Sequence, residues 1–176
     1  EADIPLVLMT YTNILYNQTY QKFISRAKEV GIDGLILPDM AIEESKDYVK
    51  AAKKSGMDTI FLVSPNTQND RLKKIIKATS GFLYMVAVFG TTGVQTKIHK
   101  YTIDALKNTK RSANGKIPVG VGFGISTDKD VHKYVSSGAD AVIVGSANIK
   151  IMENTPVNKI ESKIFTFTKK LKNKTR

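Results

Sequence analysis

The order of apolar and polar residues along the chain alternates between two periods, and this predicts alternating strands and helices. Short, nearly continuous apolar runs are typical of parallel strands that are covered on both faces. Segments with apolar residues at steps of three and four are typical of helices that pack one face on such a sheet. We expect strands near residues 6–11, 35–38, 59–64, 82–87, 119–123 and 141–144.

A short pattern that occurs three times supports this assignment. A glycine, an apolar residue and an aspartate precede an apolar run at Gly31-Ile32-Asp33, Gly56-Met57-Asp58 and Gly138-Ala139-Asp140. The glycine fits the C-terminal cap of a helix, and the run fits a buried strand. The pattern therefore predicts parallel strands joined by crossover helices.

The segments between the strands predict where the helices begin. Asn17 and Asn69 are expected N-caps, Glu43 and Glu44 suit a first turn, and Asp128 is expected to begin a helix. Near the C-terminus, apolar residues at steps of three and four predict an amphipathic helix with one core face and one basic face. The core face comprises Val157, Ile160, Ile164, Phe167 and Leu171.

These elements favour an α/β chain with the (β/α)8 topology of a TIM barrel, with about six β/α units present. A closed barrel has eight strands and typically about 250 residues, whereas this chain has 176 and begins with Glu1. Counting back from the last two strands makes the strand near residues 6–11 the third. We therefore expect residues 1–176 to be a single, partial barrel domain that lacks the first two units. An open doubly wound sheet is the alternative.

The composition fits a globular domain and excludes several kinds of site. Of the residues, 41% are apolar and 24% charged, which is ordinary for soluble chains. There is no cysteine and there are only two histidines, so we expect no thiolate or histidine metal cluster. No apolar run approaches the roughly 18 to 20 residues that cross a bilayer. Much of the formal charge of +11 lies near the C-terminus, where a solvated helix face explains it better than nucleic-acid binding does.

Two glycine-bearing turns are the strongest functional signal. Val121-Gly122-Phe123-Gly124-Ile125-Ser126 and Val144-Gly145-Ser146-Ala147 each follow an apolar run and precede a predicted helix. Glycine lets backbone N–H groups approach a ligand, and a helix start adds donors and a positive dipole end. In TIM barrels the last two strands commonly build a phosphate site in this way. The predicted donors are the N–H groups of Gly124, Ile125, Gly145 and Ser146, with the Ser146 hydroxyl.

Other side chains at predicted strand ends allow more than one interpretation. Asp39 could act as a general acid or base, or could accept loop N–H bonds as a structural group. Tyr84 could contact an aromatic substrate or fill the core. Phe123 is expected to form an apolar wall beside the ligand, and Asn66 to form a turn. The loop Gly90-Thr91-Thr92-Gly93 suits a lid that closes over the substrate.

Several of these motifs together resemble the alpha subunit of tryptophan synthase. Tyr11-Thr12-Asn13, Leu37-Pro38-Asp39, Ser64-Pro65-Asn66 and Gly90-Thr91-Thr92-Gly93 are similar to family loops and follow in the family's order. The two glycine turns match its strand-seven and strand-eight turns, although they also occur in other phosphate barrels. Ala41 stands where the family commonly has proline, and Val88 where it often has arginine.

The resemblance implies a lyase of tryptophan biosynthesis that cleaves indole-3-glycerol phosphate, by a retro-aldol step, to indole and glyceraldehyde 3-phosphate. It implies phosphate ligands at Gly93, Gly124, Gly145 and Ser146, and a supporting role for Thr92 in orienting a catalytic aspartate. Asn13, Asp39 and Asn66 would be structural or interface residues. The side chains expected to line the indole pocket are Met9, Tyr11, Ile36, Leu62, Tyr84 and Phe123.

The resemblance further implies a cytoplasmic protein without a metal or organic cofactor, whose partner is the beta subunit in an alpha-beta-beta-alpha complex. The family's acid–base pair, a glutamate and an aspartate, has no counterpart in this sequence. We therefore expect the 176-residue segment alone to be inactive, and the complete protein to be the enzyme. The alternatives are another phosphate-barrel enzyme, such as a glycerol-phosphate prenyltransferase, and a non-catalytic binding or regulatory partner.

Overall fold

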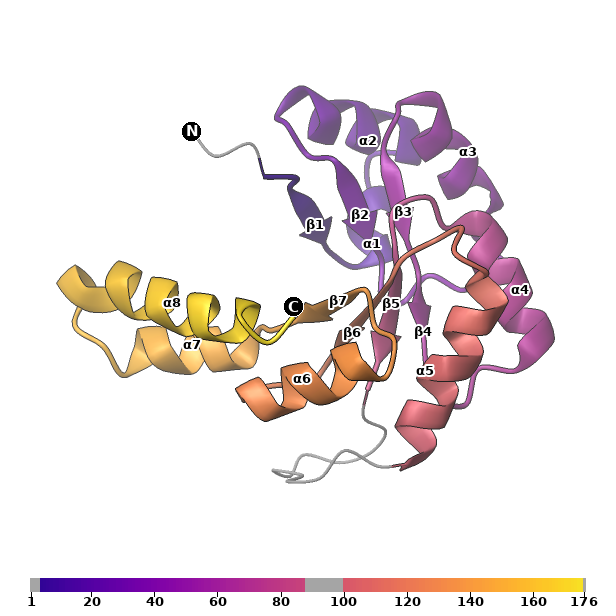
Figure 1. Ribbon diagram of the computed structural model, residues 1–176. Helices are drawn as coiled ribbons and strands as arrows, with labels where there is room; N and C mark the ends of the chain where they lie inside the picture. Colours follow the sequence, from indigo (N-terminus) through magenta and orange to yellow (C-terminus); the bar gives the residue numbers. More distant parts are fainter. Residues whose placement is uncertain (1–3, 88–99, 176) are drawn as a thin grey trace. The chain divides into compact units, whose positions relative to one another are not determined.

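A computed structural model describes residues 4–87 and 100–175, in which strands alternate with helices (Figure 1). The strands in these residues are β1 (Val7–Met9), β2 (Gly34–Ile36), β3 (Asp58–Ile60), β4 (Leu62–Val63), β5 (Leu83–Val86), β6 (Val119–Gly122) and β7 (Ala141–Ile143). The helices are α1 (Thr12–Tyr16), α2 (Tyr20–Glu29), α3 (Lys46–Lys54), α4 (Asn69–Ala78), α5 (Lys100–Ala113), α6 (Asp128–Ser136), α7 (Ser146–Glu153) and α8 (Val157–Lys172). All six predicted strand segments are present, and the one near residues 59–64 is divided into β3 and β4.

Residue contacts group the chain into two compact units. The first comprises Glu1–Val63, Thr67–Tyr84 and Ser112–Ile117. The second comprises Ser64–Asn66, Met85–Arg111 and Pro118–Arg176.

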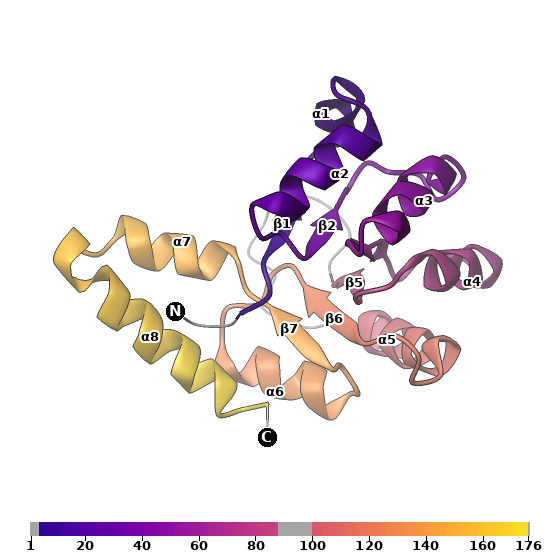
Figure 2. The ribbon, with the colours of Figure 1, turned by 90° about the horizontal axis from the view of Figure 1, so that it is seen from above.

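The first unit contains a parallel three-stranded sheet in the order β1-β2-β3. Its register pairs Met9 with Ile36, and Ile36 with Ile60. Helices α2 and α3 pack side by side along this part of the chain (Figure 2). The core here is apolar, and its fully buried side chains include Leu15, Ile24, Leu35, Tyr48 and Leu72.

The second unit is built around β6 and β7, which pair in parallel with Gly120 opposite Ala141 and Gly122 opposite Ile143. The Ala87 N–H, just after β5, donates to the Gly122 carbonyl at 2.8 Å. All four residues of β6 are buried, and Val119, Val121 and, from α6, Val131 are core side chains. Helices α7 and α8 pack against each other, and α8 also contacts α6.

The helix ends confirm part of the prediction and correct the rest. Gly31, Gly56 and Gly138 follow helices at φ values of +88°, +62° and +104°, the left-handed region in which glycine costs least. Asp128 begins α6 as expected. The other predicted starts are wrong: α2 and α4 are capped by Thr19 and Gln68, and α3 begins after Ser45, beyond Glu43 and Glu44.

The C-terminal amphipathic helix forms as α8, but its predicted core face is only partly covered in the described residues. Leu171 is buried, whereas Ile160, Ile164 and Phe167 are half-buried. Val157, at the first position of the helix, is 88% exposed. The apolar periodicity therefore predicted the helix correctly, and the degree of burial less well.

Candidate phosphate site and indole wall

The turn after β6 has an unusual backbone. Phe123 lies at φ +76° and Gly124 at φ +73°, so two consecutive residues occupy the left-handed region. Glycine adopts this conformation readily, but a bulky residue does so at a cost of about 1 kcal/mol or more. The Phe123 side chain is 56% exposed. Such strain is found mainly at functional sites, where the backbone must present particular groups.

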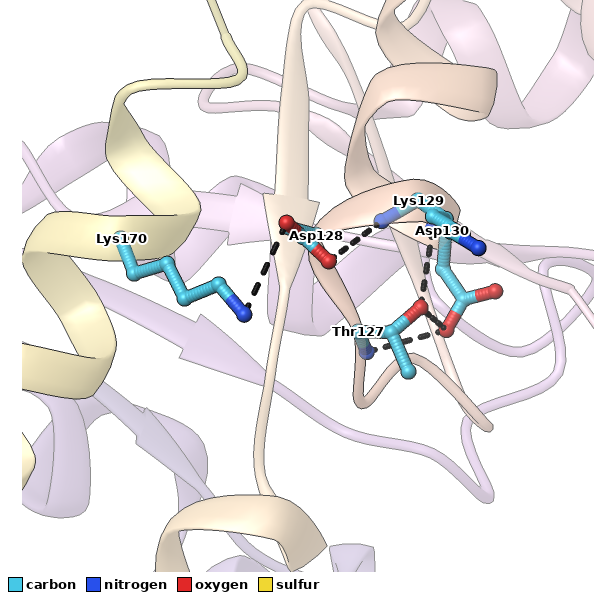
Figure 3. A network of polar contacts seen from close by, with 5 residues as sticks. All are labelled: Thr127, Asp128, Lys129, Asp130 and Lys170. Carbon is cyan, nitrogen blue, oxygen red and sulfur yellow. Dashed lines mark hydrogen bonds and ion pairs between the residues drawn. The ribbon is translucent and has the colours of Figure 1, made fainter.

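Helix α6, which follows this turn, is capped by its own side chains (Figure 3). The Thr127 hydroxyl accepts the Asp130 N–H at 3.2 Å, and the Asp130 carboxylate accepts the Thr127 N–H at 3.0 Å. The same carboxylate accepts the Ser126 N–H at 3.3 Å. From α8, the Lys170 ammonium lies 3.7 Å from the Asp128 carboxylate. At the start of α6, the N–H groups of Ser126 and Thr127 are therefore already bound by the Asp130 carboxylate, and the Asp130 N–H by the Thr127 hydroxyl.

Helix α7 begins differently. Its N-cap is Gly145, no side chain in the described residues caps it, and its first turn carries no acidic residue. Gly145 has φ −111°, which lies outside the left-handed region that favours glycine. A Cβ added at Gly145 would meet nothing within 4 Å among the described residues. Neither the backbone nor a described neighbour therefore requires glycine here, whereas close approach of a ligand to the backbone would.

The predicted phosphate donors in the described residues belong to the same unit. Gly124 and Ile125 follow β6, and Gly145 and Ser146 follow β7, its direct partner in the sheet. The Ile125 side chain is buried, and Ser146 is exposed. Parallel neighbours end at the same edge of a sheet, so the two turns follow adjacent strand ends. Gly93, the remaining predicted ligand, and Thr92 lie outside the described residues.

Asp39 is held by Thr12, in agreement with its structural interpretation. The Thr12 N–H donates to the two carboxylate oxygens at 2.9 and 3.1 Å, and the Thr12 hydroxyl donates at 2.9 Å. Burial acts to raise the pKa of Asp39, but these hydrogen bonds outweigh it and lower that pKa below its ordinary value. A low pKa and occupied lone pairs suit an anchor for the start of α1 better than a proton-transfer group.

The predicted indole wall of the first unit lies on and just after its strands. Met9 and Ile36 are paired across β1 and β2, so their side chains point to the same face of the sheet. Ile36 is buried and Met9 is 49% exposed. Tyr11, the N-cap of α1, is 65% exposed. Leu62 lies half-buried in β4.

Tyr84 is buried in β5, where its N–H donates to the Phe61 carbonyl at 3.0 Å. Its ring stacks on Phe82, with the ring centroids 6.5 Å apart. Burial raises the pKa of Tyr84, so its hydroxyl is protonated at neutral pH. Both expectations for this residue, core filling and contact with an aromatic ligand, are compatible with this position.

The two asparagines predicted at strand ends are exposed. Asn13 lies in α1, where its carbonyl accepts the Asn17 N–H at 3.3 Å. Asn66 lies in the turn before α4. Both positions suit a structural or interface role, and neither asparagine touches the phosphate turns by any described hydrogen bond.

Comparison with known proteins identifies the family. The whole chain, residues 1–176, matches the family described as tryptophan synthase alpha chain. It is 40% identical to the tryptophan synthase alpha chain of Pyrococcus abyssi over 151 residues, 86% of this chain and 60% of that one. It is also 40% identical to the protein of the same name from Methanococcus vannielii over 166 residues, 92% of this chain and 63% of that one.

The chain belongs to the tryptophan synthase alpha chain family. It spans about three fifths of the length of these relatives. Its structure resembles that of a chain in the tryptophan synthase α2β2 complex from Pyrococcus furiosus, with a TM-score of 0.89 and 35% identity over 98% of this chain and 68% of that chain. The predicted fold, a TIM barrel with about six β/α units in this chain, is thereby confirmed.

The sequence analysis did not identify two sets of hydrogen-bonded residues beside the candidate site. Thr127 and Asp130 fit the capping pattern of a hydroxyl residue followed three positions later by an acid, so that signal was available. The pairing of Thr12 with Asp39 joins residues 27 positions apart, and no local pattern reveals it.

In the described residues no group of three or more acidic or histidine side chains could hold a metal, and none of the helices has the length and apolar composition of a membrane span.

Proposed function

We propose that the protein containing this chain is the alpha subunit of tryptophan synthase. It is a carbon–carbon lyase of tryptophan biosynthesis that cleaves indole-3-glycerol phosphate to indole and glyceraldehyde 3-phosphate in the cytoplasm. Residues 1–176 are a single, partial barrel domain of this enzyme. Membership of the tryptophan synthase alpha chain family supports the reaction class.

The start of α7 is the structural observation that supports a phosphate-binding site in this chain. A helix start that no described side chain caps offers N–H donors and the positive end of a dipole, and both favour a phosphate dianion. Gly145 leaves room for it, and the Ser146 hydroxyl adds a donor. The acids Asp128 and Asp130 lie at α6 instead, so the two helix starts have different electrostatic characters.

The substrate phosphate is accordingly bound by the backbone of Gly124, Ile125, Gly145 and Ser146, with Gly93 contributing from its own loop. The indole ring lies against Met9, Tyr11, Ile36, Leu62, Tyr84 and Phe123. The protein binds the phosphate with neutral dipoles, so the substrate is held without a metal ion. No metal or organic cofactor is part of the proposal.

The cleavage itself requires that indole C3 be protonated and that a glycerol hydroxyl lose its proton. The phosphate turns and the indole wall supply binding and orientation for this step, and Thr92, which lies outside the described residues, helps to orient the catalytic aspartate. Asp39 has a structural role in this proposal, as the acceptor of the Thr12 hydrogen bonds, and does not transfer a proton. The family's acid–base pair, a glutamate and an aspartate, has no counterpart in this sequence. Loss of one acid–base group costs about 10² to 10⁴ in rate, so the 176-residue segment by itself is predicted to cleave indole-3-glycerol phosphate negligibly.

The partner of the enzyme is the tryptophan synthase beta subunit, in an alpha-beta-beta-alpha complex. The likeness to a chain from the α2β2 complex of Pyrococcus furiosus supports this assignment. The exposed residues Asn13 and Asn66 suit the interface. We expect the basic face of α8 to contact solvent and not to bind nucleic acid.

Titration with indole-propanol phosphate tests the proposal. The full-length protein should bind this unreactive analogue saturably and should release indole from indole-3-glycerol phosphate, and the beta subunit should raise that rate. Binding of a prenyl diphosphate that depends on Mg²⁺ would instead indicate the prenyltransferase alternative. Capture of the beta subunit without turnover would indicate a non-catalytic partner. Assaying residues 1–176 beside the full-length protein tests the predicted inactivity, and robust cleavage by the segment would refute it.

A further inference from the structure

A charged and hydrogen-bonded cluster outside the proposed phosphate site joins the first residue of β6, Val119, to Asp140, the residue directly before β7. The Asp140 carboxylate accepts the Val119 N–H at 2.7 Å, and the Asp140 N–H donates to the Val119 carbonyl at 3.0 Å. From α5, the Lys110 ammonium donates to both oxygens of this carboxylate at 2.7 and 2.6 Å. We call Lys110, Val119 and Asp140 the β6–β7 clamp.

The clamp holds the opposite end of the two strands from the phosphate turns. β6 ends at Gly122 and β7 at Ile143, which are paired, and each phosphate turn follows directly. The strands have only four and three residues, so few ladder hydrogen bonds fix their register. The reciprocal bonds between Val119 and Asp140 therefore contribute a large share of the constraint on how far each strand extends.

The charge of Lys110 makes this constraint stronger. Its side chain is 27% exposed and that of Asp140 is 39% exposed, so solvent screens their attraction less than that of a fully exposed pair. Two hydrogen bonds from one ammonium to one carboxylate also restrict where the carboxylate can lie. The clamp thus ties α5 to the start of β7 as well as β6 to β7.

We propose that Asp140 is a positioning residue for phosphate binding. By fixing the start of β7 against that of β6, it sets the relative positions of the Gly124 and Ser146 amides, which must converge on one phosphate. This inference rests on the proposed function. A site of this kind needs its donors within about 0.5 Å of the productive geometry, so a small shift of either strand lowers the affinity.

The first unit contains an equivalent cluster that serves as a matched control. The Asp33 carboxylate accepts the Leu6 N–H at 2.8 Å, and the Asp33 N–H donates to the Leu6 carbonyl at 2.8 Å. The Lys28 ammonium lies 3.7 Å from the same carboxylate. This cluster joins β1 to β2, and neither strand carries a proposed phosphate ligand.

The experiment compares Asp140→Ala with Asp33→Ala in the full-length protein, using inorganic phosphate as the probe. Calorimetric titration at constant ionic strength should give a dissociation constant about tenfold higher for Asp140→Ala and a nearly unchanged one for Asp33→Ala. Urea midpoints should fall in both variants. Asp140→Asn keeps an oxygen that can accept the Val119 N–H and should recover part of the affinity.

Two results would overturn the inference. One is phosphate affinity in Asp140→Ala equal to that of the unmodified protein, and the other is equal weakening by the two alanine variants, since that would reflect general loss of stability. Titration of the unmodified protein with indole-propanol phosphate separates the two proposals. If it binds and Asp140→Ala retains full phosphate affinity, the positioning role alone fails; if it binds neither compound, the proposed function fails as well.

Discussion

The carboxylate of Asp39 accepts both the amide and the hydroxyl of Thr12, and so ties the loop after β2 to the start of α1. Tyr11, a proposed indole contact, immediately precedes Thr12 and is the N-cap of that helix. The bonds therefore restrain the backbone next to a proposed ligand contact. They also make the stability of the first unit depend on the charge of one side chain.

This dependence predicts a pH effect with a defined sign. The pKa of Asp39 is lowered in the folded protein, so its stabilising effect is complete above its unfolded pKa, about 4. The effect is lost as the pH falls through the lower folded value. Asp39→Asn should lower the free energy of unfolding by about 1 kcal/mol at neutral pH, and the difference should vanish in acid. Urea unfolding from pH 7 down to pH 2 measures both.

The hydroxyl of Thr12 supplies the control for that experiment. Thr12→Ser keeps the donor and should behave like the unmodified protein, whereas Thr12→Val removes it and should lose part of the stabilisation. A deficit in Asp39→Asn that stays constant down to pH 2 would show that the carboxylate charge is not responsible.

Gly145→Ala should separate ligand binding from stability. The backbone of Gly145 accepts alanine, and its Cβ would meet no described atom within 4 Å, so the free energy of unfolding should change by less than about 1 kcal/mol. The methyl group would occupy the space of the phosphate, and the dissociation constant for indole-propanol phosphate should rise at least about tenfold.

Gly56→Ala is the converse control. Gly56 lies at φ +62° with open space around a Cβ, so alanine should cost about 1 kcal/mol of stability and leave the affinity unchanged. Unaltered binding by Gly145→Ala would remove the main support for the phosphate site at α7.

Gly34→Ala should destabilise the first unit through overpacking. Its Cβ would lie 2.8 Å from Ile60 Cδ1 and 3.2 Å from Asp58 Cβ. Because Gly34 is buried in β2, we expect a loss of about 1 to 2 kcal/mol. Ile60→Val removes the nearest atom, so the loss from Gly34→Ala should be smaller in that background. A double-mutant cycle measured by urea unfolding tests the coupling, and strict additivity would contradict it.

The α6 capping box should contribute more to the free energy of unfolding than the neighbouring ion pair between Lys170 and Asp128 does. Thr127→Ala removes the hydroxyl that accepts the Asp130 N–H and should cost about 1 kcal/mol. Lys170→Met removes an ammonium that lies 3.7 Å from the Asp128 carboxylate, on a side chain that is 66% exposed, and should cost less than about 0.5 kcal/mol. Thermal unfolding of both variants decides the order, and a larger shift for Lys170→Met would reverse this ranking.

The strands and the fold class could be predicted from sequence because their signals extend over many residues. Apolar runs after Gly31, Gly56 and Gly138 indicated parallel strands, and all three glycines adopt positive φ. The capping assignments failed because each depends on one residue. Asn17 and Asn69 are good caps by propensity, but Thr19 and Gln68 take that position, one or two residues away, and a single-residue preference does not fix a helix end more finely than that.

The phosphate and indole contacts stay predictions from the sequence. The glycine turns stand out there because phosphate binding by main-chain amides needs a recognisable backbone. The capping of α6 was missed, although Thr127 followed three positions later by Asp130 fits a known capping pattern. The role of Asp39 remained open in the sequence, since Thr12 reaches it only through the fold.

The conformation of Phe123 has a consequence for laboratory evolution. Replacing it with glycine relieves the left-handed backbone but removes the ring from the proposed indole wall. Variants selected only for heat resistance should therefore accumulate glycine at position 123. Variants selected for growth without tryptophan should keep the aromatic residue and tolerate its cost.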